Sequence, residues 1–339
     1  MTTAARSHTE VVQVSDAKFA RVRWADFLTG EQLPVNLYMK LDKNRYGLTF
    51  LAQERLEKAR LMLQDPSEAP WLYFLAQERT LLMKQLSAEL LNVIGGVRPR
   101  SAHESLALLG EFAHQYHEAV VASGIGAATM PEGRLMAEGI SHLLKNEREL
   151  VQLMLGLESD ELHRLCPAFL TAFLSGLIVS RMSWGTRTTL EHTALGGLLC
   201  DIGLLRLPLN LRQKKSYQLD EKETLMWQEH PRLGVEMLDE STWIPESIKQ
   251  IVYQHHELMN GKGFPGQLTG YYIYPMAKVV GFAQAFAEFL LSHQLSALEG
   301  IRIFLRRPEV VERYDQQVIR TFLGCFVYKA PKQRREGGV

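Results

Sequence analysis

Cysteine is scarce in this chain, and its scarcity limits the kinds of protein that the sequence can encode. Only Cys166, Cys200 and Cys325 occur among 339 residues. An odd number of cysteines spread over so long a chain does not imply a disulfide framework, so a reducing compartment fits best. The N-terminal residues also lack the apolar core of a signal peptide. We therefore expect a cytoplasmic protein.

Long apolar runs and net charge are missing as well. The two most apolar segments, residues 168–179 and 279–291, are too short to span a bilayer and predict buried helices instead. Lysine plus arginine equals aspartate plus glutamate at 38 each, so the formal net charge is +0. This balance argues against a dedicated nucleic-acid binder. We expect neither a membrane nor a nucleic acid as a partner.

What is present predicts a mostly α-helical protein with a small α/β unit near its start. Strand and helix patterns of that unit fall at residues 35–41, 46–50, 52–63 and 71–75. From Thr80 onward the apolar spacing is almost wholly helical. Ser101 followed by Glu104 matches a capping box, which predicts that a helix begins there.

These patterns divide the chain into five parts. We expect a disordered start, a small α/β domain that could receive a regulatory input, a helical connector with a linker, an all-helical domain and a basic tail. Their predicted bounds are residues 1–10, 11–80, 81–133, 134–328 and 329–339.

The candidate chemistry lies in the helical part, where three histidines fall within 27 positions, at His230, His255 and His256. Upstream, Asp201 follows Cys200 at the end of an apolar helical run. Neutral imidazoles and a carboxylate suit divalent iron, zinc or manganese. Two adjacent histidines on a helix cannot both point straight at one position, so the second would reach toward another metal ion or a phosphate. Such a pair is compatible with a binuclear site.

Three segments give this pattern a family resemblance. "LLCDIGL", "EHPRLGVEML" and "HHELMNGKGFPGQLTG" stand in the order and approximate spacing of the HD-GYP family, which the chain resembles over about residues 145–325. The family is a helical subclass of the HD metallophosphohydrolases, and its members typically hydrolyse cyclic di-GMP with two or three iron or manganese ions. The resemblance implies an HD-GYP-like helical domain over residues 134–328.

Residue by residue, the resemblance assigns Asp201 the role of the metal-bridging, catalytic aspartate. The metal-binding histidines of the family fall on His230, His255 and His256. The Gly-Tyr-Pro signature falls on Gly263, Phe264 and Pro265, with phenylalanine in place of tyrosine.

Other positions depart from the family pattern. Cys200 replaces the histidine of the His-Asp pair, and Leu204 replaces a lysine. The earliest metal histidine falls on Cys166, or on Ala168 with a shifted gap, and the last aspartate falls on Gln284. A thiolate can bind zinc or iron, so Cys166 and Cys200 are candidate ligands, although free cysteine is also a common buried apolar residue. Losing a cation and a carboxylate predicts impaired hydrolysis.

Three basic side chains are candidates for binding the substrate. Lys262 lies between two glycines of the signature loop, and Arg181 and Arg187 flank a predicted loop between helices. Arginine suits bidentate recognition of phosphate, whereas a solvated surface lysine is the simpler interpretation of Lys262. His192 is interpreted as a surface or pocket-rim histidine, and His114 and His117 as solvated or core-edge histidines of an amphipathic helix.

Two classes of function therefore stay open. The first is a degenerate HD-GYP-like signalling protein that binds cyclic di-GMP or a related nucleotide, or another signalling protein through its Gly-Phe-Pro loop, with impaired or absent hydrolysis. The second is an active cyclic di-GMP phosphodiesterase with an atypical centre of iron, manganese or zinc. We prefer the first, in which a metal need not be bound at all, because both the cation and the last carboxylate are missing.

Overall fold

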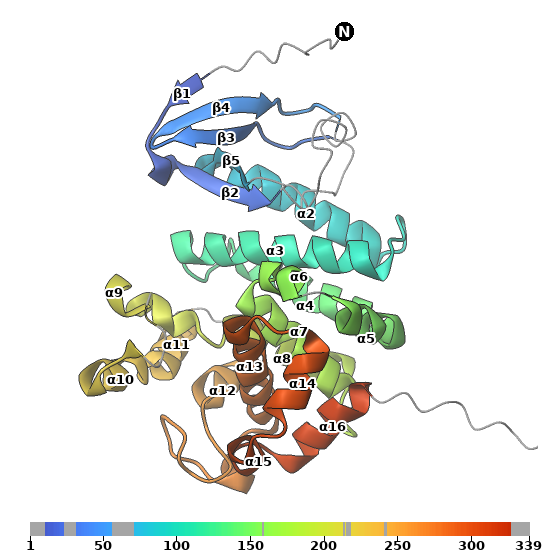
Figure 1. Ribbon diagram of the computed structural model, residues 1–339, viewed down its shortest axis with the longest axis vertical. Helices are drawn as coiled ribbons and strands as arrows, with labels where there is room; N and C mark the ends of the chain where they lie inside the picture. The colour runs from blue at the N-terminus through green and yellow to red at the C-terminus, as the bar shows by residue number, and fades with distance from the viewer. Residues whose placement is uncertain are drawn as a thin grey trace, which may run out of the picture.

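The structure is a computed structural model that describes residues 11–23, 32–55, 71–157, 159–212, 214, 218–240 and 243–326. A small antiparallel sheet lies at one end of the molecule, and layers of helices make up the remainder (Figure 1). The predicted fold class, mostly α with a small α/β part at the N-terminal side, is confirmed. The predicted disordered start, residues 1–10, and the predicted basic tail, residues 329–339, lie outside the described residues.

The sheet has five strands in the order β1-β4-β3-β5-β2, and all neighbours are antiparallel. The strands are β1 (Val11–Gln13), β2 (Phe19–Arg23), β3 (Leu37–Asp42), β4 (Arg45–Phe50) and β5 (Trp71–Leu75). The strands predicted at residues 35–41, 46–50 and 71–75 correspond to β3, β4 and β5, whereas β1 and β2 were not predicted. The helix predicted at residues 52–63 does not begin as expected, because residues 52–55 form a turn and an isolated bridge. Residues 56–63 lie outside the described part.

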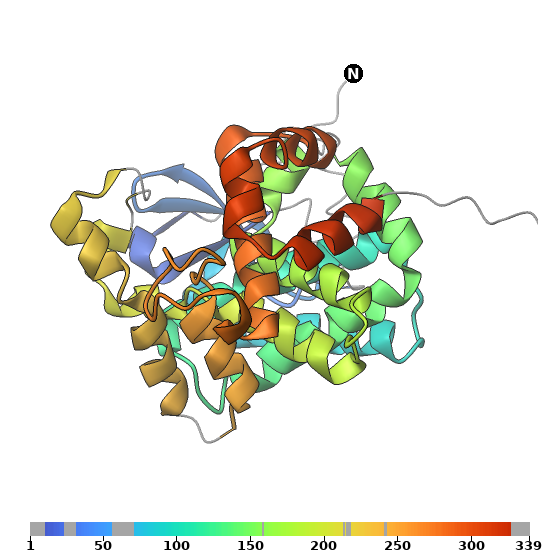
Figure 2. The ribbon, with the colours of Figure 1, turned by 90° about the horizontal axis from the view of Figure 1, so that it is seen from below.

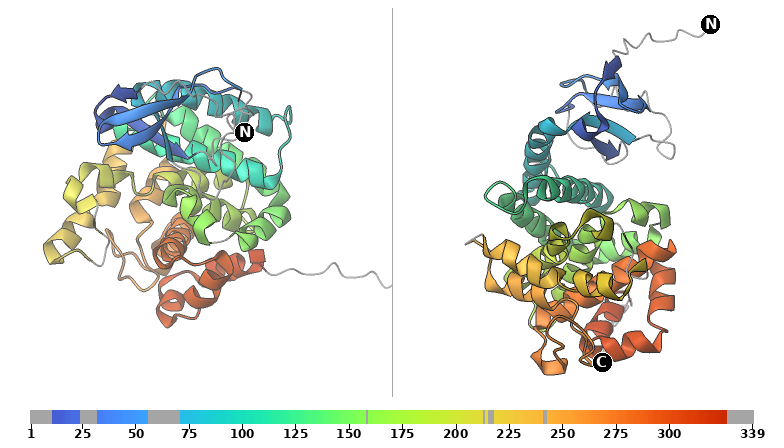
Figure 3. Two further views of the ribbon diagram at one scale, coloured as in Figure 1. Left: turned by 45° about the horizontal axis from the view of Figure 1, so that its top comes forward. Right: turned by 90° about the vertical axis from the view of Figure 1, so that its left-hand side faces the viewer.

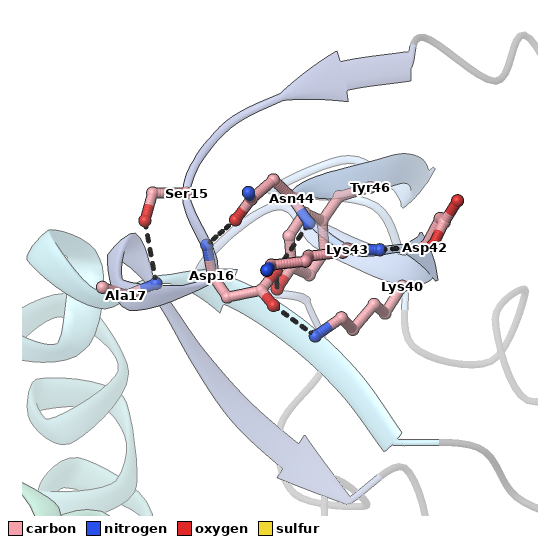
Figure 4. Close-up of polar contacts among 8 residues, drawn as sticks. All are labelled: Ser15, Asp16, Ala17, Lys40, Asp42, Lys43, Asn44 and Tyr46. Carbon is pink, nitrogen blue, oxygen red and sulfur yellow. Dashed lines mark hydrogen bonds and ion pairs between the residues drawn. The ribbon is translucent and has the colours of Figure 1, made fainter.

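One carboxylate joins the corner between β1 and β2 to the hairpin of β3 and β4 (Figure 4). The Asp16 carboxylate accepts hydrogen bonds from Lys40 Nζ at 2.7 Å, from Tyr46 Oη at 2.8 Å and from the backbone N–H of Asn44 at 2.9 Å. The backbone N–H of Asp16 in turn donates to Asn44 Oδ1 at 2.8 Å. These hydrogen bonds lower the pKa of Asp16 to about 2, and the one from Lys40 has the largest effect.

Three helices follow the sheet, namely α2 (Arg79–Ile94), α3 (Ala102–Ser123) and α4 (Met130–Leu143). The predicted capping box at the start of α3 is present in both directions, between Ser101 and Glu104. Helix α3 lies between the sheet and the remaining helices (Figure 1), and Gln115 Nε2 donates to the backbone oxygen of Arg21 in β2 at 3.3 Å. One hydrophobic cluster extends from Ala20 in β2 to Cys325 in α16, so the sheet and the helices share a core.

The hairpin of α7 (Pro167–Ser180) and α8 (Arg187–Leu199) is the centre of the helical part, and α13 (Pro275–His293) packs against both helices. The two apolar segments predicted as buried helices lie in α7 and α13, where most of their residues are buried. Figures 2 and 3 show the surrounding helices from below and from the side. These are α5 (Glu147–Gly156), α6 (Ser159–Arg164), α9 (Leu209–Arg212), α10 (Glu221–Trp227), α11 (His230–Asp239), α12 (Glu246–Gln254), α14 (Ala297–Phe304), α15 (Pro308–Arg313) and α16 (Gln316–Phe326). Among the described residues, none of the helices has both the length and the apolar character needed to span a bilayer.

Candidate metal centre

Three separate segments bring four of the predicted ligands together. Asp201 follows the C-terminal end of α8, His230 is the first residue of α11, and His255 and His256 directly follow α12. One ligand atom from each of these residues lies within 4.8 Å of the others. Segments that are distant in the sequence therefore present three imidazoles and one carboxylate to a common point.

Two glycines allow these segments to approach one another so closely. A Cβ atom at Gly203 would lie 1.9 Å from the backbone oxygen of His230, and one at Gly281 would lie 2.3 Å from the backbone oxygen of His255. Neither position tolerates a side chain without movement of the backbone. Both glycines were missed as parts of the site, although Gly203 lies two residues after Asp201 and Gly281 lies three residues before Gln284.

The hydrogen bonds of two imidazoles determine which ring nitrogen faces the cluster. Nδ1 of His230 lies 2.8 Å from the backbone oxygen of Trp227, and Nδ1 of His255 lies 2.7 Å from the backbone oxygen of Val252. Because a carbonyl oxygen only accepts, each Nδ1 carries the proton and each Nε2 offers a lone pair. The geometry of both rings is that of metal-binding histidines whose other nitrogen is held by a carbonyl group.

These lone pairs converge on one another. The two Nε2 atoms of His230 and His255 are 3.3 Å apart, and Asp201 Oδ1 lies 3.4 Å from the first and 3.6 Å from the second. In this part of the described chain, Asp201 Oδ1 and His256 Nε2 are buried and have no hydrogen-bond partner. Acceptors that face one another in this way repel, and a cation between them removes that repulsion. Three imidazoles with one carboxylate fit zinc, iron or manganese.

The protonation states also suit a metal. Burial lowers the pKa of His255 and that of His256, the latter well below its ordinary value. Burial alone would raise the pKa of the Asp201 carboxyl, whereas positive charge at the facing nitrogens of His230 and His255 would hold that pKa well below its usual range. A metal ion between the same atoms would favour the charged carboxylate in the same way. At neutral pH the two imidazoles are neutral and the carboxylate is charged, which is the state that metal ligation requires.

The signature loop covers one side of the cluster with aromatic groups. The ring of Phe264 stacks on His256 with centroids 4.5 Å apart and planes at 23°, and Trp227 meets the edge of Phe264 at 5.7 Å. Phe264 and Pro265 are joined by a cis peptide bond, and Gly263 is buried. The loop bearing the predicted Gly-Phe-Pro signature therefore packs directly against a candidate ligand.

A buried carboxylate holds this loop in place. Glu257 is 5% exposed, and its two oxygens accept hydrogen bonds from the backbone N–H groups of Gly266 at 2.5 Å and Leu268 at 2.8 Å. Sequence reasoning missed Glu257 and Trp227. The position of Glu257 next to the histidine pair was a visible signal, whereas nothing in the sequence distinguished Trp227 from a core aromatic residue.

Gln284 contacts the same aspartate from the other side. Its Nε2 donates to Asp201 Oδ2 at 2.7 Å. The position to which the resemblance assigned the last aspartate of the family therefore does face the cluster, but it presents a neutral amide. The carboxylate of Asp201 has one oxygen turned toward the imidazoles and the other bonded to this amide.

A cavity of about 730 Å³ adjoins Asp201. Cys166, the N-cap residue of α7, and Leu204 line it together with Asp201, whose side chain is 40% exposed. Two positions that depart from the family pattern therefore lie on the same side of Asp201. His114 and His117 of α3, interpreted above as solvated or core-edge residues, also line this cavity.

The structure does not bring Cys200 into the cluster, which corrects its assignment as a candidate ligand. Its Sγ donates to the backbone oxygen of Gly197 at 3.3 Å, and the side chain packs with Ile251, Met276 and Val280. Burial raises the pKa of the Cys200 thiol well above its usual value, so the thiolate that a metal needs is disfavoured.

The predicted arginines also lie elsewhere. Arg181 donates to the backbone oxygen of Gly324 at 2.7 Å, and Arg187 pairs with Glu138 and Glu191 at the protein surface. Both are at the end of the α7–α8 hairpin opposite Asp201, about 20 Å away along the helix. These arginines were predicted near the pocket because the sequence does not show which end of a helical hairpin carries the site.

Two other candidates are at the surface or its edge. Lys262 is exposed in the signature loop, where its backbone N–H donates to Asn260 Oδ1 at 3.1 Å. His192 bonds to Ser247 through Nδ1 at 2.8 Å and takes no part in the cluster.

Comparison with known proteins agrees with this geometry. An HD domain model matches residues 171–297, which include all four clustered residues. The chain is 24% identical over 157 residues to cyclic di-GMP phosphodiesterase PdeB of Borreliella burgdorferi, a match that covers 46% of this chain and 41% of the relative. It is 26% identical over 137 residues to cyclic di-GMP phosphodiesterase PA4108 of Pseudomonas aeruginosa, which covers 39% of this chain and 32% of the relative. The chain thus spans less than half the length of these two relatives.

A solved structure extends the likeness of fold to nearly the whole chain. The HDG"Y"P protein Bd1817 from Bdellovibrio bacteriovorus superposes with a TM-score of 0.66 at 16% identity, covering 90% of this chain and 98% of that one. The helical fold, the matched HD domain and the cluster of one aspartate with three histidines lead to one assignment. The chain has an HD domain over residues 171–297, and its fold is similar to that of an HDG"Y"P protein.

Proposed function

We propose that this protein binds one divalent metal ion through Asp201, His230, His255 and His256, binds a cyclic dinucleotide beside it, and hydrolyses that nucleotide slowly or not at all. The converging lone pairs of His230 and His255 support the metal, because a cation between them would turn their repulsion into ligation. A bound divalent ion would supply Lewis acidity to a phosphodiester oxygen.

The observation that carries the proposal is the hydrogen bond from Gln284 to Asp201 Oδ2. A carboxylate that bridges two metal ions needs one oxygen for each of them. Here an amide N–H group already occupies the direction of the second oxygen, and an amide is a weaker ligand than a carboxylate. With Leu204 in place of the family's lysine, the cavity also lacks a cation at the position that would stabilise charge developing on a phosphate. These features support a centre with a single metal ion and little activity.

The cyclic dinucleotide is proposed from two lines of support. Both relatives described above carry cyclic di-GMP in their names. The cavity beside Asp201 has a volume in the range that accommodates ligands of this size, roughly 300–1,000 Å³, and the exposed part of the Asp201 side chain faces it.

The intact set of imidazoles favours a second candidate, an active metal-dependent cyclic di-GMP phosphodiesterase. Its centre would use Asp201, His230, His255 and His256 with iron, manganese or zinc. Hydrolysis by such a centre would require that the amide of Gln284 not prevent activation of a water molecule beside the metal.

Three measurements on the purified full chain separate these candidates. Elemental analysis after loading with manganese, iron or zinc is expected to give about one ion per chain. Calorimetric titration is expected to detect cyclic di-GMP binding that depends on the metal. Chromatography of the same mixtures is expected to show little linear dinucleotide or GMP. Two or more ions per chain with sustained turnover would establish the phosphodiesterase, and a chain without metal or nucleotide binding would refute both candidates.

A further inference from the structure

The cavity beside Asp201 has walls from two different parts of the protein. On one wall are the end of α8 and the start of α7, which carry Asp201 and Cys166. The opposite wall consists of α3 and the edge of the sheet, including Arg21 of β2 and Trp71 of β5. Figure 1 shows why this is so, because α3 lies between the sheet and the α7–α8 hairpin. The N-terminal part of the chain therefore faces the metal centre directly.

The sheet contributes a stacked pair of flat groups to this wall. The guanidinium carbon of Arg21 lies 4.5 Å from the ring centroid of Trp71. In the register of the two strands, Arg21 pairs with Tyr73 and Arg23 pairs with Trp71, so Arg21 and Trp71 are diagonal neighbours on one face of the sheet. The hydrogen bond from Gln115 Nε2 to the backbone oxygen of Arg21 fixes this strand against α3.

Such a pair is a suitable surface for a nucleobase. Purines stack on indole rings and on guanidinium planes, and each stacked base contributes affinity without requiring a particular sequence of bases. Other groups on the cavity suit the phosphates, because His117 and Arg212 can donate hydrogen bonds there, and Arg212 Nε is a buried donor without a partner in the described structure. Among the acidic side chains of the cavity, Glu118 lies 3.7 Å from Arg79 and Glu111 accepts from Gln115 at 2.9 Å.

We infer that Arg21 and Trp71 form the base-stacking wall for a cyclic dinucleotide whose phosphate faces Asp201. This inference rests on the proposed function and adds to it a binding site built by the N-terminal sheet. The small α/β part is then a structural component of the ligand site, in addition to any role as an input unit. The ligand spans two layers of the fold, and neither layer provides the whole site.

Calorimetric titration of the metal-loaded full chain with cyclic di-GMP tests the inference. Trp71→Ala and Arg21→Ala are each expected to weaken binding about tenfold or more, since one base stack is typically worth at least that factor. Trp71→Phe keeps an aromatic surface and is expected to stay within about threefold of the wild type. Arg21→Lys keeps the charge but loses the plane, so it is expected to bind several times more weakly.

Matched controls come from surface positions far from the cavity. Trp243→Ala removes an exposed tryptophan, and Arg187→Ala removes an arginine at the opposite end of the α7–α8 hairpin. Both are expected to bind cyclic di-GMP as the wild type does. Metal content and the thermal midpoint are measured on every variant, so that a loss of folding is separated from a loss of stacking.

The outcomes distinguish this inference from the proposed function on which it rests. If the wild type binds no cyclic di-GMP, the proposed function fails and the inference fails with it. If the wild type binds the nucleotide while folded Trp71→Ala and Arg21→Ala variants remain within twofold of it, only the base-stacking wall is refuted. If Trp71→Ala does not fold, Arg21→Ala and Arg21→Lys decide, and wild-type affinity in both of these variants refutes the wall.

Discussion

The two oxygens of Asp201 face different surroundings. On the Oδ1 side stand three imidazoles, two of them with their protons fixed on Nδ1 by backbone carbonyl groups. On the other side Oδ2 accepts from the amide of Gln284, and the adjoining cavity contains Cys166 and Leu204. Under the proposed function, the difference teaches that holding a metal ion and activating a substrate would depend on separate groups around one carboxylate, so that the first capacity can be kept while the second changes.

Removing an imidazole from the Oδ1 side of Asp201 is expected to have the largest effect, on metal affinity. His255→Ala should lower metal affinity by more than about 100-fold, beyond what is typical for residues that only orient a ligand, because it deletes one of four donors from a buried site. Elemental analysis after dialysis measures the loss. His293→Ala, which removes a histidine bonded to the backbone of Phe289, serves as the control and should retain the metal. Equal metal content in both variants would contradict the centre described here.

A carboxylate placed on the Oδ2 side of Asp201 should make the two sides more alike. In Gln284→Asp the new carboxylate would face Asp201 Oδ2, and two adjacent anions repel unless a cation joins them. The variant should therefore bind about one additional manganese ion per chain, and its thermal midpoint should rise with added manganese more than that of the wild type. Gln284→Leu removes the amide without adding charge and should gain no ion. A Gln284→Asp variant with unchanged metal content and no response to manganese would show that the amide does not occupy a metal position.

Adding a side chain where α12 and α13 approach each other should have a smaller effect, on stability. The added Cβ of Gly281→Ala would lie 2.3 Å from the backbone oxygen of His255, so the helices must separate, at a cost of about 1–3 kcal/mol in the free energy of unfolding. Urea denaturation measures this loss. Gly324→Ala is a matched control, because its Cβ would have no atom within 4 Å in the described structure, and it should be neutral or slightly stabilising. Equal stability of the two variants would mean that α12 and α13 can separate without cost.

The smallest effect is expected in the sheet, away from the centre. The folded state lowers the pKa of Asp16 from 3.8 to about 2, so the unfolded chain binds more protons between these values. The stabilisation from Asp16 is therefore complete above about pH 3.8 and is lost as the pH falls toward 2. Asp16→Asn should flatten this part of the pH profile of the thermal midpoint, whereas Asp42→Asn, on the same hairpin, should not. An unchanged pH profile in Asp16→Asn would show that the Asp16 carboxylate does not stabilise the corner between β1 and β2.

The sequence carried enough information to predict the helical fold and the identity of the cluster. Apolar periodicity predicted α7 and α13, and the order of the motifs brought Asp201 together with His230, His255 and His256. The misassigned residues share a physical cause, since neither the direction of a side chain nor the end of a helical hairpin at which it lies can be inferred from residue type. Cys200 is adjacent to Asp201 in sequence and yet turns into an apolar cluster, because successive residues of a helical turn point in different directions. Glu257, Gly203 and Gly281 act through close backbone contacts that appear only once the helices are packed.

Helix α3 touches both the sheet and the cavity beside Asp201. This helix is hydrogen-bonded to β2 through Gln115 and lines the cavity beside Asp201 through His117. If an effector that displaces the sheet also changes the affinity of a ligand in this cavity, reciprocity requires that the ligand change the affinity for the effector by the same factor. The fold-change measured in the affinity of one of them would therefore give the fold-change in the affinity of the other without a second experiment.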